Sequence, residues 1–536
     1  MKEIIQEMLH DYTEMTPKES KYEVELQKNQ EEHRRVVSNC IRNCASGNYG
    51  AKETVLELID TFLKERLLPE RKDIRYLIPF HEPERMTAWQ QMEALLFFYE
   101  RKKENVGFEK LCEIAGWNYN GCVVTNADFA KLYDKVNPLF TLEEERRILA
   151  QMLFAGTVGL GVIDSLNQQK GYIEEIQIGM SGKAEQQYDY RKTFLTEKKK
   201  DSFSRDGVHV MAKGSTIRLK ALSFETEDEL QRVLRNLIKG AGGGELTKNH
   251  PMMVVDTSDG RRISVSRPPL TDTWIGLIRK FDTVQEVSLK KLYQGYPEET
   301  ILPEVIKQII RSGRNVAITG EMASGKTTLF RACLAEVRQD KNIRVIEADS
   351  FELNIRSFLP NANTVTMRVT EQMPAEEVLA FARKTTGQIF AIGEINSASM
   401  AAMAMDLSKV ASQLLFSAHY VTTEHMIADF VNAKLCVGGY SEEKLAELDV
   451  IRCLGFDIHL RVKAGRRYVQ YINEIVPCMK KGATRRSTYE IREIYRYDEE
   501  KEQGILVNTP GEISYERAKQ LLGKEEYMEF VRVFEQ

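Results

Sequence analysis

The sequence predicts an α/β protein in which a domain built on a parallel sheet follows a smaller α+β domain and an N-terminal helical region. Three observations indicate this. Short apolar runs alternate with helices over residues 290–480, strands mix with one amphipathic helix over 141–289, and helical spacing of apolar residues dominates 1–140. The remaining residues, 481–536, form a tail with a final helix. A chain of 536 residues has room for about three domains or more.

Composition narrows the class of protein. Hydrophobic residues make up 42% and charged residues 29% of the chain, as in globular proteins, and the formal net charge of −4 argues against a mainly electrostatic nucleic-acid binder. No run approaches the roughly 18 apolar residues of a membrane span, and no secretory signal opens the chain. We therefore expect a cytoplasmic protein that reaches a membrane only through partners. The eight cysteines lack zinc spacing and predict reduced, buried thiols.

Residues 1–140 contain no chemical motif. Helical periodicity is clearest over Thr54–Leu68 and Met92–Lys102, and it predicts an extension of unassigned role. After a helix from Thr141, the pattern changes to short strands and the helix Glu227–Lys239, which Gly240 ends. The expected strands are Ile173–Ile178, Gly207–Ala212, Thr216–Ala221, Met252–Val255 and Arg262–Ser266.

The next region reads as a buried parallel sheet. Its four apolar runs are bounded by turns or charged helices, which is typical of parallel strands covered on both faces. These runs are Asn315–Thr319, Ile343–Ile346, Gln388–Ile392 and Gln413–Ser417. The tail adds a strand over Thr488–Tyr497 and a charged helix from Ser514.

One motif carries chemistry. Gly320–Thr327 reads G-E-M-A-S-G-K-T and fits G-x-x-x-x-G-K-[ST], the phosphate-binding (Walker A) loop, between a buried run and the helical segment Thr328–Val337. Loop N–H groups and the positive helix end surround phosphates, Lys326 adds a positive charge, and Thr327 can ligate Mg²⁺. The motif predicts binding of ATP with Mg²⁺. The predicted phosphate-binding residues of the loop are Gly320, Ala323, Ser324, Gly325, Lys326, Thr327 and Thr328.

Such a site also needs an acidic group near the metal and the attacking water. Glu394 ends a strand-like run and is the leading candidate, against the alternative of a surface acid that follows a strand. Glu347, Asp349 and Glu352 form a second cluster that can orient water, or they are solvated loop acids. His419 ends another run, where it senses the γ-phosphate or has a structural role.

From about residue 145 to 480 the chain resembles the hexameric ATPases of type II and type IV secretion and pilus assembly, most of all the CpaF/TadA type of Tad/Flp pili. Gly171–Gly179 resembles the family strand V-T-E-I-M-V-N-G, and Asp259–Arg262 resembles D-G-S-R. Pro268–Leu270 and Ile278–Phe281 match P-P-L and I-R-K-F. The Walker A loop, the acidic box Glu347–Leu353, the Walker B segment Ile392–Ile395 and the histidine-box end Ser417–His419 follow in family order.

The resemblance implies a RecA-like P-loop ATPase domain behind the α+β domain, with ATP between the two and subunits in a hexameric ring docked on an inner-membrane platform protein. In that picture Arg262 and Arg279 reach the phosphates. Thr327 and Glu394 hold Mg²⁺, Glu347 orients the water and His419 senses the γ-phosphate.

The chain departs from the family pattern in the acidic and histidine boxes. Aligned on Asp349 and Glu352, the catalytic glutamate position falls on Ala348, while alignment on Glu347 needs an inserted residue. Asn396 replaces the arginine after Walker B, and Lys409–Ala411 replaces the opening Thr-Gly-His. Each missing group lowers the hydrolysis rate by one or more orders of magnitude in such enzymes.

The sequence therefore favours an ATP-hydrolysing motor subunit, and it leaves alternatives open. A catalytically degenerate ATP-binding subunit of the same machine is the first. A RecA-like nucleic-acid motor is the second, weakened by the acidic balance of charge, and a small-molecule kinase, for which no arginine-rich lid is found, is the third.

Overall fold

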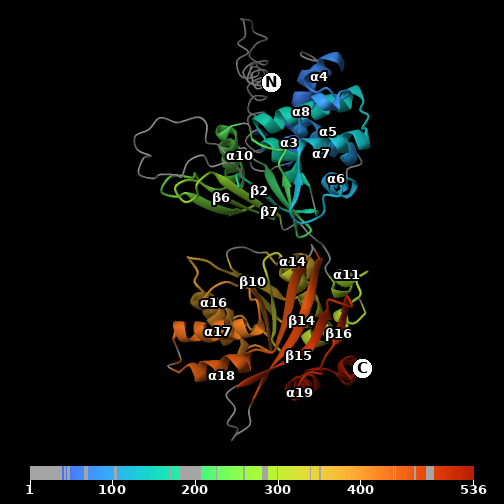
Figure 1. Cartoon of the computed structure of the whole chain (residues 1–536). Coiled ribbons are helices and arrows are strands. Elements are labelled where there is room, and N and C mark those ends of the chain that lie inside the picture. Colours follow the sequence, from blue (N-terminus) through green and yellow to red (C-terminus); the bar gives the residue numbers. More distant parts are fainter. Residues whose placement is uncertain are drawn as a thin grey trace. The chain divides into compact units, whose positions relative to one another are not determined.

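The computed structural model describes residues 39–40, 44, 49–64, 71–101, 106–169, 171–180, 207–224, 226–257, 260–280, 288–298, 300–338, 340–348, 352–438, 440, 442–463, 466–478 and 488–535. The chain divides into two compact units, Met1–Thr283 and Val284–Gln536, and each is described by itself (Figure 1). The α/β class expected from the sequence is confirmed, because both units combine a sheet with helices.

The first unit contains a seven-stranded sheet in the order β1-β4-β3-β2-β7-β6-β5. All neighbours are antiparallel except β1 and β4, which are parallel. The strands are β1 (Cys122–Val124), β2 (Ile173–Ile178), β3 (Val208–Ala212), β4 (Ser215–Leu219), β5 (Met252–Asp256), β6 (Arg261–Ser266) and β7 (Ile275–Lys280). The five strands expected from the sequence are confirmed; β1 and β7 were not predicted.

Helices cover this sheet, and the N-terminal ones are part of the same core. One hydrophobic cluster runs from Val55 in the first helix to Ile278 in β7. Figure 1 shows α3 to α8 in blue and cyan beside the sheet. The helices are α3 (Tyr49–Phe62), α4 (Arg71–Leu77), α5 (Ala88–Glu100), α6 (Gly107–Ala115), α7 (Asn126–Val136), α8 (Leu142–Thr157), α9 (Asp164–Gln168) and α10 (Glu227–Gly240), with 3₁₀ turns η2 (Pro83–Arg85) and η3 (Gly161–Ile163).

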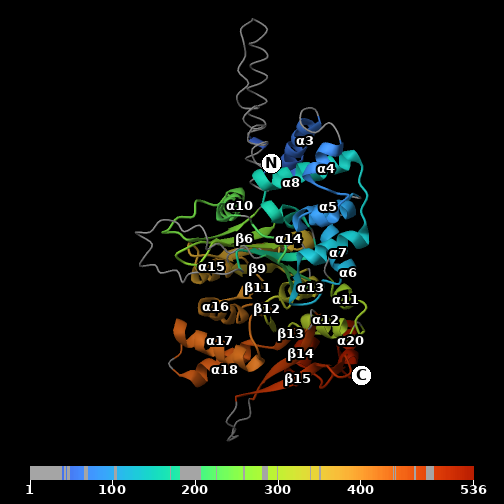
Figure 2. The same cartoon turned by 45° about the horizontal axis from the view of Figure 1, so that its top comes forward.

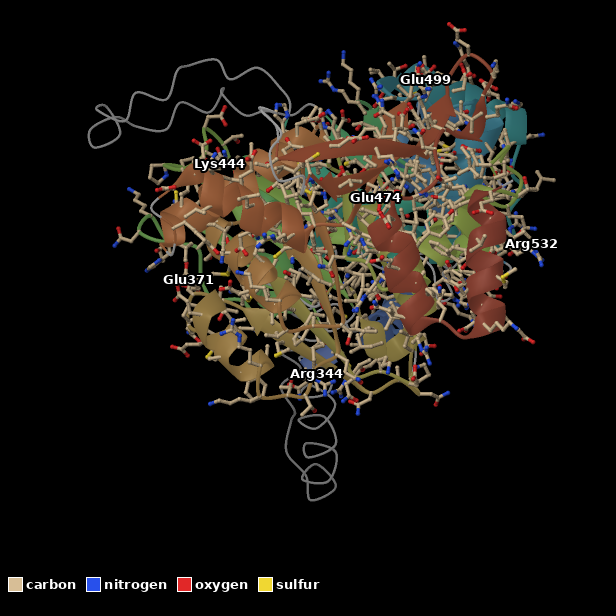
Figure 3. The ribbon with its side chains drawn as sticks, turned by 90° about the horizontal axis from the view of Figure 1, so that it is seen from below. Arg344, Glu371, Lys444, Glu474, Glu499 and Arg532 are labelled. Carbon is tan, nitrogen blue, oxygen red and sulfur yellow. The ribbon has the colours of Figure 1, made fainter. Side chains whose placement is uncertain are left out.

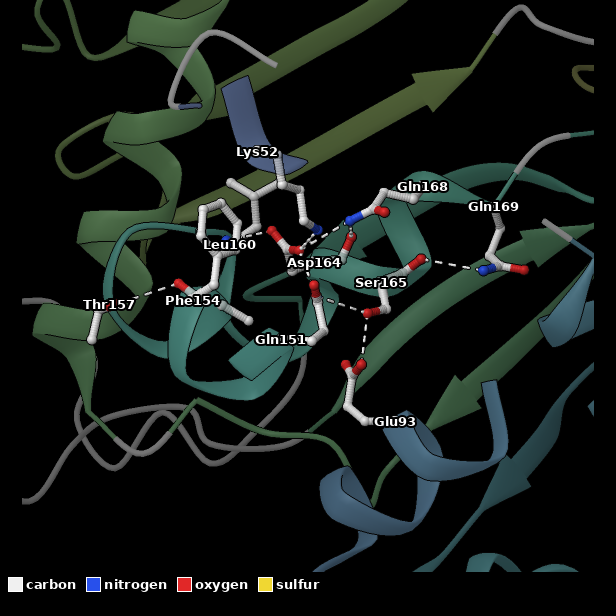
Figure 4. Close-up of polar contacts among 12 residues, drawn as sticks. Lys52, Glu93, Gln151, Phe154, Thr157, Leu160, Asp164, Ser165, Gln168 and Gln169 are labelled. Carbon is white, nitrogen blue, oxygen red and sulfur yellow. Dashed lines mark hydrogen bonds and ion pairs between the residues drawn. The ribbon is translucent and has the colours of Figure 1, made fainter. Parts of the chain in front are cut away.

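A buried polar cluster joins α3 to α8 and α9 (Figure 4). Lys52 of α3 forms an ion pair with Asp164 at 2.5 Å, and both side chains are less than 10% exposed. Asp164 also accepts hydrogen bonds from Gln151 and from the Leu160 amide. Glu93 of α5 accepts a hydrogen bond from Ser165 at 2.7 Å. Because the charges of Lys52 and Asp164 are paired away from water, they fix how α3 packs against α8 and α9.

The second unit contains a nine-stranded sheet in the order β10-β9-β11-β12-β8-β13-β14-β15-β16. The strands from β10 to β13 are parallel, and β14 to β16 extend the sheet as an antiparallel meander. The strands are β8 (Val316–Gly320), β9 (Ile343–Ala348), β10 (Thr364–Val369), β11 (Ile389–Ile395), β12 (Gln413–Ala418), β13 (Phe456–Lys463), β14 (Arg466–Pro477), β15 (Tyr489–Asp498) and β16 (Gln503–Leu506).

Alternate residues of the parallel strands enter two cores, one on each face. Val316 and Ile318 lie in one core and Ala317 in the other, and the same alternation holds for β9, β11 and β12. Figure 2 shows α16, α17 and α18 on one side of the strands and α12, α13 and α20 on the other. The prediction of parallel strands covered on both faces is therefore confirmed, and the order, with β12 between β8 and β11, is RecA-like.

The helices of this unit connect the strands, and the last two follow the final strand. They are α11 (Leu289–Tyr293), α12 (Leu302–Arg311), α13 (Lys326–Glu336), α14 (Ile355–Phe358), α15 (Ala375–Ala382), α16 (Ala398–Ser408), α17 (Thr423–Val437), α18 (Glu443–Cys453), α19 (Glu512–Leu521) and α20 (Lys524–Phe534). Glu474 of β14 accepts a hydrogen bond from the Gly511 amide at 2.6 Å and so fixes the start of α19 (Figure 3). The single final helix expected from Ser514 is wrong: the segment folds as α19 and α20, with Gly523 preceding α20.

Two further sequence expectations meet the structure. All eight cysteines are free thiols, as expected, although Cys436 is exposed and only four are buried. Among the described residues, no helix has the length and hydropathy needed to span a bilayer.

Candidate nucleotide-binding site

The G-x-x-x-x-G-K-T segment forms a tight loop between β8 and α13. Gly320 has φ +141°, Ala323 φ +59° and Gly325 φ +92°, so three of its residues lie at positive φ. A Cβ at Gly320 would approach the Leu460 carbonyl oxygen of β13 to 2.3 Å. The predicted loop is therefore present, and β13 lies close against its first glycine. Its second glycine, Gly325, precedes the 11-residue helix α13, which begins at Lys326 and whose N-terminal N–H groups attract anions.

Lys326 is the centre of the polar contacts of the loop. Its ammonium donates to the carbonyl oxygens of Gly320 at 3.1 Å and Glu321 at 2.6 Å, and to Nδ1 of His419 at 3.0 Å. Since an ammonium only donates, Nδ1 of His419 accepts, and its Nε2–H faces Glu394 Oε1 at 2.8 Å. The structure thus brings Lys326 at the start of α13, His419 directly after β12 and Glu394 of β11 into one hydrogen-bonded chain.

The rest of the loop fits a phosphate with Mg²⁺. Ser324 is fully buried, and its Oγ has no hydrogen-bond partner among the described atoms. Thr327 and Thr328 occupy the first turn of α13 and remain partly exposed. The hydroxyl of Thr327 and the carboxylate of Glu394 are the oxygen donors that Mg²⁺ prefers. No cluster of three or more histidine, cysteine or acidic side chains that could hold a metal occurs in the described ranges, so the metal would depend on phosphate oxygens as well.

Glu347 and Glu394 end neighbouring strands but differ in exposure. Glu347 of β9 is 2% exposed, and a Cβ on Gly393 of β11 would lie 3.1 Å from its Cγ. Burial raises the pKa of Glu347 to about 7, against backbone hydrogen bonds that lower it, including one from Leu353 at 2.8 Å. The Glu394 side chain, by contrast, is 39% exposed. Of the two carboxylates, Glu394 is therefore the one that a ligand can reach, whereas Glu347 is buried next to Gly393.

The other acidic candidates lie in or near the loop after β9. Asp349 is outside the described residues. Glu352 is half-buried, and its carbonyl oxygen accepts a hydrogen bond from Arg331. The water-orienting role expected for Glu347 stays a prediction.

Arg262 and Arg279 belong to the first unit. They are directly opposite one another on β6 and β7. Arg262 forms an ion pair with Asp256 at 3.1 Å, and Arg279 is exposed. Their contact with nucleotide phosphates remains a prediction from the family resemblance.

Sequence reasoning missed the groups that β13 and β14 bring to the loop. Arg467 of β14 donates to the Ala323 carbonyl at 3.0 Å, and no motif marks it. Asp457 and His459 do leave a signal, because two polar residues alternate with apolar ones in Phe456–Leu460, a run that pairs with β8. Polar side chains at those positions of a buried strand indicate an internal hydrogen-bonded network.

No model of a known protein family matches the chain. A protein of Bacillus anthracis described as uncharacterized is 24% identical over 197 residues, which is 33% of this chain and 43% of that protein. The chain thus matches less than half the length of this curated relative.

Three solved structures share low similarity with the chain. The VirB11 ATPase of the Brucella suis type IV secretion system is 14% identical, with a TM-score of 0.28 over 56% of this chain and 89% of that one. The Legionella pneumophila ATPase DotB is 12% identical (TM-score 0.38; 69% and 93%). The pilus retraction motor PilT with bound ADP is 14% identical (TM-score 0.37; 67% and 93%). All three TM-scores are below 0.5, so the functional argument depends on the residues of this chain.

Proposed function

We propose that the chain is an ATP-binding and ATP-hydrolysing motor subunit of a type II/IV secretion or pilus-assembly machine. The observation that carries the proposal is the contact of the P-loop Lys326 with His419 and of His419 with Glu394. A lysine at the loop, a carboxylate near the end of β11 and a polar group directly after β12 are parts that phosphoryl transfer to water uses.

Each side chain has a separate task in this proposal. Lys326 and the loop N–H groups bind the phosphates, while Thr327 and Glu394 hold Mg²⁺, which when bound neutralises charge on the phosphate oxygens. His419 reports the state of the γ-phosphate, since it contacts both Lys326 and Glu394. Glu347 orients the water in its ionised form, and Arg262 and Arg279 add charge from the first unit.

The finer assignment follows the sequence resemblance. We assign the subunit to the CpaF/TadA type, acting as a homohexameric ring at the cytoplasmic face of the membrane, docked on an inner-membrane platform protein and without a nucleic-acid partner. A stimulation of ATPase activity by DNA that declines with salt would instead favour the nucleic-acid motor.

Steady-state Mg²⁺-ATP hydrolysis tests the proposal. Lys326→Ala is expected to lose both binding and turnover, and Glu394→Gln is expected to bind ATP but hydrolyse it at least about a hundredfold more slowly. Lys384→Ala and Glu371→Gln, which change exposed residues of the same unit, are the matched controls. Wild-type turnover equal to that of Lys326→Ala, at protein concentrations that favour ring assembly, would overturn the motor assignment.

The second candidate is a degenerate subunit that binds ATP and does not hydrolyse it. Two observations favour it: Ala348 stands in the acidic box, and Glu347 is buried with its pKa raised to about 7. Calorimetry with ATP and Mg²⁺ separates the candidates. Binding that Lys326→Ala abolishes, with no turnover above that variant, identifies the degenerate subunit.

A further inference from the structure

A fully buried carboxylate lies next to the candidate phosphate loop. Asp457 is on β13, which pairs in parallel with β8. Its Oδ1 accepts a hydrogen bond from the Thr319 hydroxyl at 2.5 Å, and its Oδ2 accepts one from the Thr423 hydroxyl at 2.7 Å. Both oxygens are therefore satisfied by hydroxyl groups from two separate segments.

Both segments belong to the candidate active site. Thr319 directly precedes Gly320, the first residue of the phosphate loop, and Thr423 is the first residue of α17, four positions after His419. Lys326 and His419 make the direct contact between the same two segments, at 3.0 Å. Asp457 thus joins the loop and the His419 segment by a second, buried route.

The direction of every hydrogen bond in this network is determined. An ionised carboxylate only accepts, so both threonine protons point to Asp457. The Thr319 oxygen then accepts from Nδ1–H of His459 at 2.8 Å, and the Thr423 oxygen accepts from Asn473 at 3.0 Å. Burial and the charge of Lys326 lower the pKa of His459 to about 4, so its ring is neutral at pH 7. A hydrogen-bonded network whose donors and acceptors are fixed in this way favours one arrangement and resists displacement.

An acceptor-only group is needed at position 457. Burial raises the pKa of Asp457 to about 6, although the bonds from Thr319 and Thr423 oppose this, so the carboxylate is costly to bury. An asparagine would donate from its N–H₂ group to one of the two hydroxyls, whose own proton would then need another acceptor. The free-energy cost of burying this carboxylate indicates that the hydrogen-bond geometry it imposes on Thr319 and Thr423 has a function.

We propose that Asp457 is a positioning residue that holds the phosphate loop and the His419 segment at a fixed separation through Thr319 and Thr423. This rests on the proposed ATP-binding and hydrolysing function. Binding energy comes from the loop N–H groups and Lys326, which belong to the loop and α13 and not to α17. Alignment of His419 with Glu394 does depend on it, so the network controls turnover more than affinity.

Thr423→Val and Thr423→Ser form a matched pair. Valine keeps the shape and loses the hydroxyl, whereas serine keeps the hydroxyl and loses a methyl group. Thr423→Val is expected to lower kcat about tenfold or more, with the ATP Kd within about twofold of wild type, because small misplacements of catalytic groups cost rate. Thr423→Ser is expected to stay within about twofold in kcat. If the wild type hydrolyses ATP, equal kcat values for the two variants would overturn the proposal.

A double-mutant cycle distinguishes positioning of His419 from general loss of structure. If the network acts through His419, adding Thr423→Val to His419→Gln lowers kcat no further. Multiplication of the two effects would contradict that route. Thr319→Val, a β-favouring change within β8, repeats the test from the other arm if Thr423→Val does not fold, as judged by circular dichroism.

Hydrogen exchange tests the proposal independently of hydrolysis. In the nucleotide-free full chain, Thr423→Val should speed the exchange of the amides of residues 419–422 at least about tenfold relative to Thr423→Ser, because α17 loses its anchor. Equal exchange in the two variants refutes the positioning role even if the wild type hydrolyses ATP. If the wild type does not hydrolyse ATP but Thr423→Val still exchanges faster than Thr423→Ser, the positioning role is supported and the motor assignment is rejected.

Discussion

The ion pair between Lys52 and Asp164 gives a stability prediction whose size follows from the structure. Its side chains are 9% and 6% exposed, and Lys52 lies 5.0 Å from the centre of the Phe154 ring. Lys52→Met removes the cation and leaves a buried carboxylate. Removing one partner of a buried pair costs about 3–5 kcal/mol. Because Asp164 keeps hydrogen bonds from Gln151, Gln168 and the Leu160 amide, we expect the lower end, about 3 kcal/mol.

Tryptophan fluorescence is the assay, because all three tryptophans of the chain, Trp89, Trp117 and Trp274, lie in the first unit. Unfolding of that unit is thus followed without interference from the second. A loss of about 3 kcal/mol corresponds to a fall in melting temperature of roughly 6–12 °C for a unit of this size.

Two further variants test whether burial of the Lys52–Asp164 ion pair causes the expected loss of stability. Lys213→Met breaks an ion pair with Glu109 in which Lys213 is 66% exposed, and it should cost less than about 1 kcal/mol. Adding Asp164→Asn to Lys52→Met should recover part of the loss, since no buried charge then remains. A loss for Lys52→Met equal to that for Lys213→Met would refute the reasoning.

Three further predictions follow from single residues. Burial raises the pKa of Glu93 to about 7, so the contribution of Glu93 to the stability of the first unit should be full below pH 4.5 and should be lost as pH rises through 7; Glu93→Gln should remove this loss in fluorescence-monitored denaturation at pH 5 and 8. Gly320→Ala should weaken ATP binding at least about tenfold in calorimetry, because the new Cβ would meet the Leu460 carbonyl, whereas Gly523→Ala, with its nearest atom at 3.7 Å, should not. If Glu347 orients the water, kcat should rise with pH through about 7 as its carboxyl ionises, and Glu347→Gln should abolish this rise; a flat profile in the wild type would exclude the role.

The local sequence pattern was sufficient to predict five strands of the first sheet and the four parallel strands β8, β9, β11 and β12 of the second. The apolar runs at β8, β11 and β12 are unbroken, the run at β9 is interrupted only by Arg344, and such short runs are typical of strands buried on both faces. The strands that were missed have weaker patterns. β14 carries Asn473 and Glu474 within an apolar stretch, and β10 is an edge strand with only Met367 buried, so neither shows a clean period.

The helical region shows what sequence periodicity leaves undetermined. The pattern marked helices before residue 140 but not what they pack against. In the structure, β1 pairs with β4 and Val55 shares a core with Ile278, contacts that are more than 90 and 200 residues apart in the chain. Such pairing depends on tertiary packing, which a window of neighbouring residues does not contain. The division of the chain at residues 140, 289 and 480 stays a prediction.

In the candidate site, too, some residues were located from the sequence and others were not. The motif located Lys326, and strand ends located Glu394 and His419, because the carboxyl ends of parallel strands meet at one edge of a sheet. Neither the motif nor the strand ends revealed that Glu347 is buried next to Gly393, since the exposure of the Glu347 side chain depends on the packing of β9 against β11. They also did not reveal Arg467, because the antiparallel return of β14 brings that side chain to the loop.

The positions that depart from the family pattern are separate from those that hold the loop. Ala348 ends β9, and Asn396 follows β11. The loop itself is held by β8, β13 and β14, through the Leu460 carbonyl, Arg467 and Asp457. If the chain binds and hydrolyses ATP as proposed, we expect changes on the β9 and β11 side to reduce hydrolysis and to leave the phosphate loop in place. A chain with altered acidic and histidine boxes can thus keep ATP affinity while its turnover varies, and binding and hydrolysis must be measured separately to tell a motor from a nucleotide-binding subunit.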